Sequence, residues 1–239
     1  EHCHISDKTV KDVLLEAGCS DKLQGVLAYH WGNMGLPPGK LSFAPFAMMS
    51  NHYFEGAAFP VGGSGSIAKA FCEAIFSDGG RVFVRSPVAR ILVEGRRAVG
   101  VVLQNGKKIL ARRGVVSSVG ARVTYEKLLV GESSVVEACQ AVRALEPSCQ
   151  HVQVFACFER TEGLPARNYW CSDGFDHDGN YDAYMGDDTQ PFPAVFISFP
   201  SAKDPTWTDR YPGVSTCHII APLATDRFAA WEGKRVKHR

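Results

Sequence analysis

The chain has 239 residues, of which 45% are hydrophobic and 21% are charged, an ordinary composition for a folded protein that can bury a real core. Its formal net charge of +1 gives no case for a nucleic-acid-binding surface. No apolar run approaches the roughly 20 residues that a membrane-spanning helix needs. The sequence therefore predicts one large domain or two small ones, with no nucleic-acid partner.

The eight cysteines are scattered and form no C-x-x-C pair. A chain of this length does not need disulfides to fold, so we expect reduced, mostly buried thiols and no zinc site. A metal ion could be coordinated by His2, Cys3 and His4, but no further ligand lies near them in the sequence. We therefore expect no bound metal.

The first 27 residues predict two helices. In residues 6–17, apolar side chains recur at helical spacing, and Gly18 can end that helix in a left-handed conformation. Ser20 can cap a second helix, whose Leu23, Val26 and Leu27 we expect to face inward.

Residues 41–59 contain the densest local cluster of Phe, Met and Tyr. This cluster can be plain core packing or one wall of a tunnel for a long apolar ligand, and the two interpretations are compatible. His52 lies in the cluster, just before a glycine-rich turn. We expect His52 and its neighbour Tyr53 to contact a bound ligand.

The glycine-rich turn that follows matches a dinucleotide-binding fingerprint only in part. Gly63-x-Gly65-x-x-Ala68 has the right spacing, and a helix is predicted to follow at residues 64–77. The fingerprint also needs a buried strand directly before it, and Pro60 interrupts that position. We therefore interpret the turn as a close-packing element beside a cofactor that is bound mostly elsewhere.

Apolar runs after this helix predict a small β-meander. Asn105-Gly106 is typical of a two-residue hairpin loop. The expected strands are residues 81–85, 88–94, 99–103, 107–111 and 115–118.

The second half predicts two helices and then a mixed or antiparallel sheet of the kind that floors a substrate cavity. Alternation along residues 151–159 predicts a strand with Val152, Val154, Ala156 and Phe158 on a buried face. Residues 176–182 carry alternating carboxylates but have Tyr181 where a calcium loop requires glycine, so we expect a solvated acidic loop. The helices are expected at residues 124–130 and 133–145, and further strands at 168–171, 194–199 and 214–221.

Two stretches resemble a known family. The first stretch resembles the middle of phytoene-desaturase-like flavoproteins. It runs from His52-Tyr53 through Pro60-x-Gly62-Gly63 and Val88-x-x-Ile91 to Val115-Val116-Ser117. Residues 199–213, FPSAKDPTWTDRYPG, are more specific and look like the retinol saturases within that family. The resemblance covers about residues 10–231.

The resemblance implies an α/β (α+β) fold in which a partial, Rossmann-like FAD-binding domain is interwoven with a mixed-sheet substrate domain. Residues 1–58 and 131–239 would be substrate-domain segments, and residues 59–130 the FAD-domain segment. Gly62, Gly63 and Val88 match positions that lie against FAD in related flavoproteins. The main nucleotide motif of the family is not found, so we expect a central fragment of a longer protein that does not retain FAD by itself.

The implied activity is saturation of a polyene double bond, the 13,14 bond of all-trans-retinol, by hydride from reduced FAD, with NAD(P)H as the electron donor. A carotenoid isomerase or desaturase is the close alternative, and a non-catalytic retinoid- or lipid-binding module the more distant one. The family implies association with the endoplasmic reticulum membrane, with the plastid as the alternative. No catalytic residue or proton donor is visible in the sequence.

Overall fold

A computed structural model describes residues 7–145, 149–187, 189–224, 227–231 and 234. It divides into two compact units, Glu1–Phe71 with Ser148–Arg239, and Cys72–Pro147. Helices and antiparallel sheets make an α+β structure, as predicted. The assignment of residues 1–58, 59–130 and 131–239 to substrate and FAD domains stays a prediction, as does the Rossmann-like character.

The first unit begins with two short helices, α2 (Val10–Glu16) and α3 (Asp21–Leu27). Gly18 follows α2 with φ of 74°, and Ser20 caps α3, so both predicted helices and these two boundary signals are confirmed. Helix α2 begins at Val10, later than the predicted start at residue 6, where Thr9 and Asp12 form a capping box. The prediction that one face of α3 points inward is wrong. Its larger apolar side chains are substantially exposed: Leu23, Val26 and Leu27.

Trp31 is the centre of the core of this unit. It lies in the short 3₁₀ helix η1 (Trp31–Asn33) and is fully buried. Its ring packs edge to face against the ring of Tyr181, with 5.8 Å between the ring centroids. Around it pack α2, α4 (Phe43–Phe54) and α7 (His177–Gly186). The cluster comprises Val10, Ala28, Trp31, Leu41, Phe46, Tyr181 and Ala194.

Helix α7 corrects the prediction of a solvated acidic loop at residues 176–182. Asp176 is the helix N-cap, and its side chain accepts a hydrogen bond from the Gly179 N–H. Tyr181 and Tyr184 are buried on the inner side of the helix. The alternating carboxylates suggested a loop, but burial of the two tyrosines against the rest of the unit stabilises a helix there.

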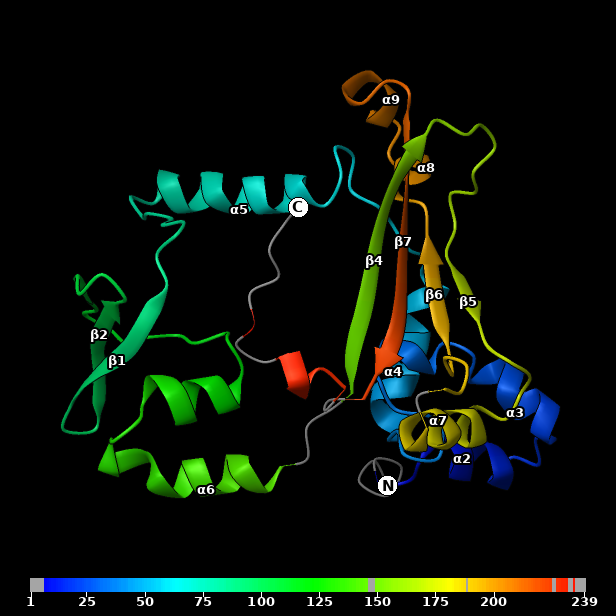
Figure 1. Ribbon diagram of the computed structural model, residues 1–239, viewed down its shortest axis with the longest axis horizontal. Helices are drawn as coiled ribbons and strands as arrows, with labels where there is room; N and C mark the ends of the chain where they lie inside the picture. Colours follow the sequence, from blue (N-terminus) through cyan, green and yellow to red (C-terminus); the bar gives the residue numbers. More distant parts are fainter. Residues whose placement is uncertain (1–6, 146–148, 188, 225–226, 232–233, 235–239) are drawn as a thin grey trace. The chain divides into compact units, whose positions relative to one another are not determined.

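A four-stranded antiparallel sheet with the order β4-β7-β6-β5 forms the other half of the unit. Helices α2, α3, α4 and α7 gather at one end of the sheet, and α8 and α9 lie at the other (Figure 1). This confirms the predicted antiparallel alternative. The elements are β4 (Gln150–Glu159), β5 (Tyr169–Cys171), β6 (Val195–Ser198), β7 (Val214–Leu223), α8 (Pro200–Lys203), α9 (Trp207–Arg210) and η4 (Ala229–Trp231).

Strand β4 is confirmed, but the buried face predicted for it is wrong. Val154 is 52% exposed and Phe158 is 36% exposed. In the described structure β4 lies at the edge of the sheet and pairs with β7 alone.

The described residues of the second unit form a three-stranded antiparallel sheet, the end of α5 and short helical segments. The hairpin at Asn105-Gly106 is confirmed, although its loop has three residues, because the Leu103 N–H donates to the Lys107 carbonyl. Gly106 has φ of 82°, as the last residue of such a loop requires. The elements are β1 (Val88–Glu94), β2 (Arg97–Leu103), β3 (Lys108–Leu110), the π-helix η2 (Val123–Leu128), η3 (Ser133–Val135) and α6 (Val136–Ala144).

Two predicted strands of this unit, residues 81–85 and 115–118, are irregular in the structure. Val84 and Val116 are exposed there rather than packed in a sheet. Apolar β-branched residues favour a strand only where a neighbouring strand completes the hydrogen bonds, and among the described residues neither segment has one.

Helix α5 (Gly65–Ser77) forms where the sequence predicts it, and its residues span the boundary between the units. None of its described residues is buried, and Ile67, Phe71 and Phe76 expose half or more of their surface. Among the described residues no helix is both long and apolar enough to cross a bilayer.

The described cysteines are unpaired, as predicted, but they are half-buried or exposed rather than mostly buried. No group of His, Cys, Asp and Glu within the described ranges could hold a metal ion. His2, Cys3 and His4 lie outside those ranges.

Candidate functional site

The glycine turn is a tight turn directly before α5. The Gly63 N–H donates to the Pro60 carbonyl at 3.0 Å, and Gly62 and Gly63 have φ of 87° and 81°. A positive φ at the third residue of the turn is the mark of a type II turn, which favours glycine. Gly62 and Gly63, both expected to lie beside a cofactor, therefore have a conformational reason to be glycine.

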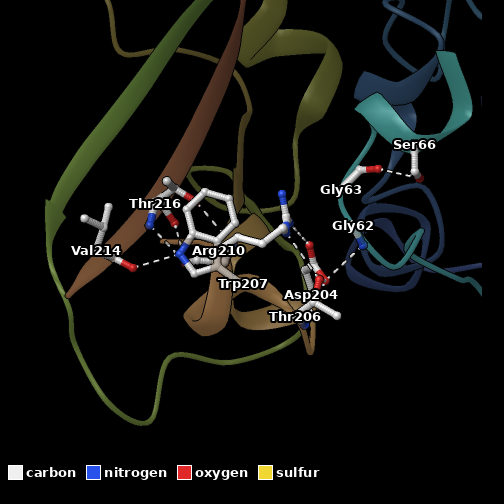
Figure 2. Close-up of polar contacts among 10 residues, drawn as sticks. Gly62, Gly63, Ser66, Asp204, Thr206, Trp207, Arg210, Val214 and Thr216 are labelled. Atoms are coloured by element: carbon white, nitrogen blue, oxygen red, sulfur yellow. Dashed lines mark hydrogen bonds and ion pairs between the residues drawn. The ribbon is translucent and has the colours of Figure 1, made fainter. Parts of the chain in front are cut away.

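A buried carboxylate holds this turn from the sheet end of the unit. The Gly62 N–H donates to Asp204 Oδ1 at 3.1 Å, across 142 residues of sequence (Figure 2). The same oxygen accepts hydrogen bonds from the backbone N–H and hydroxyl of Thr206, and Oδ2 pairs with the Arg210 guanidinium. We call Asp204 with Gly62, Thr206 and Arg210 the Asp204 clamp.

The electrostatics of the Asp204 clamp favour an ionised carboxylate. The Asp204 side chain is 1% exposed, and burial by itself raises the pKa of a carboxyl group. Hydrogen bonds from Gly62, Thr206 and Arg210 outweigh that effect and lower the pKa of Asp204 to about 2. At neutral pH the turn is therefore held by a charge-assisted hydrogen bond.

The segment at residues 199–213, the most specific part of the resemblance, forms the clamp and its support. The Trp207 indole N–H donates to the Val214 carbonyl at 2.8 Å (Figure 2). The Arg210 guanidinium lies over the rings of Trp207 and Tyr211, at 5.7 and 5.1 Å from their centroids. These contacts fix α9 against β7 and hold Arg210 beside Asp204.

Four N–H groups of the turn and of the first turn of α5 are already used in hydrogen bonds within the protein. The N–H groups of Gly62, Gly63, Ser66 and Ile67 already donate to acceptors of the protein. What the turn offers is a backbone surface free of side chains, which lets a flat group approach closely. Its residues thus fit a flavin cofactor lying against the turn.

Lys203 lies next to the clamp, at the end of α8. Its ammonium donates to Ser198 Oγ at 2.7 Å and to Asn168 Oδ1, and lies 5.7 Å from the centroid of the Phe59 ring. Phe59 directly precedes the glycine turn. This cation is therefore the point where the turn and the sheet come together.

Residues paired across antiparallel strands point to the same face of the sheet, so the register places Ser198, His218 and Phe155 together. The rings of Phe155 and His218 stack at 4.3 Å, and His218 Nε2 is 3.2 Å from Gln153 Oε1. Burial lowers the pKa of His218. We call this side the cavity face, with Trp170, Phe196, Ser198, His218, Ile220, Gln153 and Phe155.

A cavity of about 240 Å³ lies on the cavity face, lined mainly by apolar groups. Ligand sites typically measure roughly 300–1,000 Å³, so this cavity suits one end of a long ligand. The Gly32 backbone packs closely against the Trp170 ring, since a side chain at that position would come within 2.4 Å of it. The lining comprises Gly32, Asn33, His151, Gln153, Trp170, Phe196, Ile220 and Pro222.

Tyr53 is near this cavity, whereas His52 has no such link. The Tyr53 hydroxyl accepts a hydrogen bond from Asn33 Nδ2 at 3.2 Å, and Asn33 lines the cavity. His52 is exposed on α4 and its ring lies 6.2 Å from that of Tyr53. The roles of both residues toward a substrate stay predictions.

Val88 begins β1 in the second unit, paired with Leu103, and is half-buried. The structure therefore brings Gly62 and Gly63 together in one unit and leaves Val88 in the other. Sequence reasoning missed Asp204 and Lys203, although both stand within the segment whose resemblance was most specific. The adjacent acid and lysine in that segment, Lys203-Asp204, were the available signal.

The candidate site thus consists of a small, mainly apolar cavity on the cavity face and a glycine turn fixed by the Asp204 clamp. Known proteins were compared with the chain by sequence. No protein-family model matches the chain. Curated proteins do match it over nearly its whole length.

The chain is 34% identical over 242 residues to the all-trans-retinol 13,14-reductase of Macaca fascicularis, covering 97% of this chain and 40% of the relative. A protein of Danio rerio named inactive all-trans-retinol 13,14-reductase is 32% identical over 209 residues, 83% of this chain and 35% of that protein. The chloroplastic prolycopene isomerase of Arabidopsis thaliana is 26% identical over 192 residues, 78% and 29% of the two chains.

The resemblance to retinol saturases predicted from the sequence is thus confirmed. The chain is similar to all-trans-retinol 13,14-reductases from end to end and spans about 40% of their length.

Proposed function

We propose that this chain forms the polyene-binding part of an oxidoreductase that saturates the 13,14 double bond of all-trans-retinol with FAD as cofactor. The observation that carries the proposal is the similarity to retinol 13,14-reductases over nearly the whole chain. The cavity face supports it, because a long apolar molecule with one polar end needs an elongated, mainly apolar site with few polar groups.

In this proposal Gly62 and Gly63 lie against the flavin and Val88 against its adenine side. Reduced FAD supplies a hydride, with NAD(P)H as the source of electrons. The contribution of the chain is to orient the polyene and exclude water, and the Asp204 clamp keeps the glycine turn fixed at the edge of the site. Residues 59–130 then belong to the FAD domain, and residues 1–58 and 131–239 to the substrate domain.

The polyene enters the 240 Å³ cavity with one end and extends along the cavity face toward Ser198. His52 and Tyr53 contact the polyene from α4. The position of Tyr53 is set by the hydrogen bond that its hydroxyl accepts from Asn33. The proposed location is the endoplasmic reticulum membrane, by peripheral association, with the plastid as the alternative if the substrate is a carotenoid.

Two experiments test this function. The natural polypeptide containing the sequence is incubated with all-trans-retinol, FAD and NADPH, and the products are separated by chromatography. Formation of 13,14-dihydroretinol is expected, and its absence would contradict the assignment. The 239-residue chain alone is expected to bind retinol, seen as quenching of Trp170 fluorescence, and to be colourless after purification because it does not retain FAD.

Two other functions would give different products. The similarity to prolycopene isomerase favours a carotenoid isomerase or desaturase, which would change double-bond geometry or number in a carotenoid and leave retinol intact. The relative named inactive favours a non-catalytic retinoid- or lipid-binding module, which would bind retinol without producing dihydroretinol.

A further inference from the structure

We propose that Lys203 is the general acid that supplies the proton when the polyene is saturated. This inference rests on the proposed function and identifies the group that the sequence did not reveal. Saturating a carbon–carbon double bond takes a hydride and a proton. The proton must come from a group that is both positioned against the cavity face and able to release it.

The position of Lys203 is fixed by three contacts. Its ammonium donates two hydrogen bonds, to Ser198 Oγ and to Asn168 Oδ1, and lies near the Phe59 ring. An ammonium has three N–H bonds, and among the described residues no acceptor is found for the third. Ser198 and Asn168 are thus positioning residues that leave one N–H bond available to a ligand.

The contacts also place the ammonium between the two parts of the candidate site. Ser198 and Phe196 are two residues apart on β6, so their side chains share the cavity face at a separation of about 7 Å. Phe196 lines the cavity. On the other side, Phe59 precedes the glycine turn, which Asp204 anchors. A polyene reaching from the cavity toward the turn therefore passes Lys203.

The electrostatic surroundings make Lys203 a better acid than an exposed lysine. Burial lowers the pKa of Lys203, because the charged form loses hydration. The neighbouring carboxylate, Asp204, is paired with Arg210, and within the described ranges no carboxylate forms an ion pair with Lys203. His218, which faces Ser198 from β7, also has a pKa lowered by burial, which favours its neutral form, so it adds no charge beside Lys203 at neutral pH.

The proposed step balances in atoms and electrons. One carbon of the double bond accepts a hydride from the reduced cofactor, and the π electron pair moves to the other carbon. That carbon forms a C–H bond with the proton of Lys203 Nζ, whose N–H bond breaks. Lys203 is left as a neutral amine and regains a proton from water, which its half-exposed side chain can reach.

The first test measures the amine itself, without catalysis. The 239-residue chain is treated with acetic anhydride at a series of pH values, and acetylation of Lys203 is followed by mass spectrometry. Half-maximal reactivity is expected at lower pH in the folded chain than in the urea-unfolded chain. Bound all-trans-retinol is expected to slow acetylation of Lys203 but not of Lys8, which pairs with Glu16 on the surface. Unchanged Lys203 reactivity with retinol bound would overturn the proposal.

The second test separates an acid from a merely structural cation. Lys203→Arg keeps the charge and the hydrogen bonds but cannot release a proton near neutral pH. We expect it to bind retinol normally and to saturate it about 10²-fold or more slowly, the usual contribution of a general acid. Lys203→Met should be equally slow, and Lys8→Arg, the matched control, should be unaffected.

The pH profile gives the same distinction independently. The wild-type rate should fall as pH rises through the pKa of Lys203, because only the ammonium donates, and Lys203→Arg should lack this fall. Wild-type activity with an equally active Lys203→Arg would overturn the acid role alone. Retinol binding without saturation by the wild-type protein would overturn the proposed function, and the acid role with it.

Discussion

In the unit formed by Glu1–Phe71 and Ser148–Arg239, buried side chains surround Trp31 and a buried carboxylate fixes the glycine turn. In Cys72–Pro147 the buried apolar side chains are few, Ile91, Leu103 and Val142, and Val116 is 99% exposed. The cavity face, the Asp204 clamp and the glycine turn therefore belong to the better-packed unit, and of the candidate residues only Val88 lies in the other. Substitutions in the better-packed unit should therefore lower the unfolding free energy much more than substitutions in Cys72–Pro147.

The largest expected effect comes from Trp31→Ala, which empties the centre of the better-packed unit. Truncating a fully buried aromatic residue costs about 3–5 kcal/mol of unfolding free energy. The loss should appear in urea denaturation, and hydrogen exchange should show that peptides of residues 1–71 and 148–239 lose protection. Equal loss of protection in residues 72–147 would mean that the two units unfold together.

The next effect is the loss of the Asp204 clamp. Asp204→Asn keeps the shape but removes the charge that accepts hydrogen bonds from Gly62, Thr206 and Arg210, so the urea midpoint should drop. The pKa of Asp204 is about 2 when folded and 3.8 as a free side chain. Its contribution is therefore complete above about pH 4 and lost as pH falls toward 2.

This pH dependence has a matched control. Acid titration of the wild-type chain should show a loss of stability between about pH 4 and 2 that is smaller in Asp204→Asn, where only Asp12 and Asp187 among the described groups keep a lowered carboxyl pKa. Asp209→Asn, an exposed acid of the same segment, should titrate like the wild type. An Asp204→Asn chain with an unaltered acid transition would show that the carboxyl group does not stabilise the fold.

A smaller effect is expected from Gly62→Ala. A side chain in the left-handed conformation costs about 1–2 kcal/mol. The nearest atom, Ser66 Cβ, would be 3.7 Å from the new methyl group, so backbone strain and not a clash accounts for the loss. Gly65→Ala, at the start of α5 with open space around it, should be neutral or slightly stabilising. Equal destabilisation by both variants would point to a cause other than backbone strain.

The smallest expected effect is that of Val116→Ser in the second unit. A side chain that is 99% exposed has little packing to lose, so unfolding free energy should stay within about 0.5 kcal/mol. A destabilisation above that limit would show that Val116 is covered in solution. The difference between the two units would then be smaller than the exposed fractions indicate.

Local signals were predictable from the sequence because neighbouring residues determine them. Ser20 and Gly18 mark helix ends through their own hydrogen bonds and dihedral angles. Alternation likewise located β4. These features depend on residues a few positions apart, where composition and spacing carry the information.

What the sequence could not reveal depends on distant partners. Gly62 and Asp204 are 142 residues apart, and no spacing rule joins them. Acidic residues at 176–182 concealed α7 because burial of Tyr181 stabilises that helix. For the candidate site, the glycine turn was visible locally, whereas the position of Lys203 followed only from the sheet register and the contact with Phe59.

The exposed edge of β4 has a consequence for handling the protein. In the described sheet its backbone pairs with β7 on one side, which leaves a ten-residue strand with open hydrogen-bonding groups on the other. Such edges template intermolecular pairing, and natural proteins protect them with lysine or proline. Residues 150–159 contain neither. Concentrated preparations of this chain are therefore expected to self-associate strand to strand, and a lysine at Val154 should keep them monomeric.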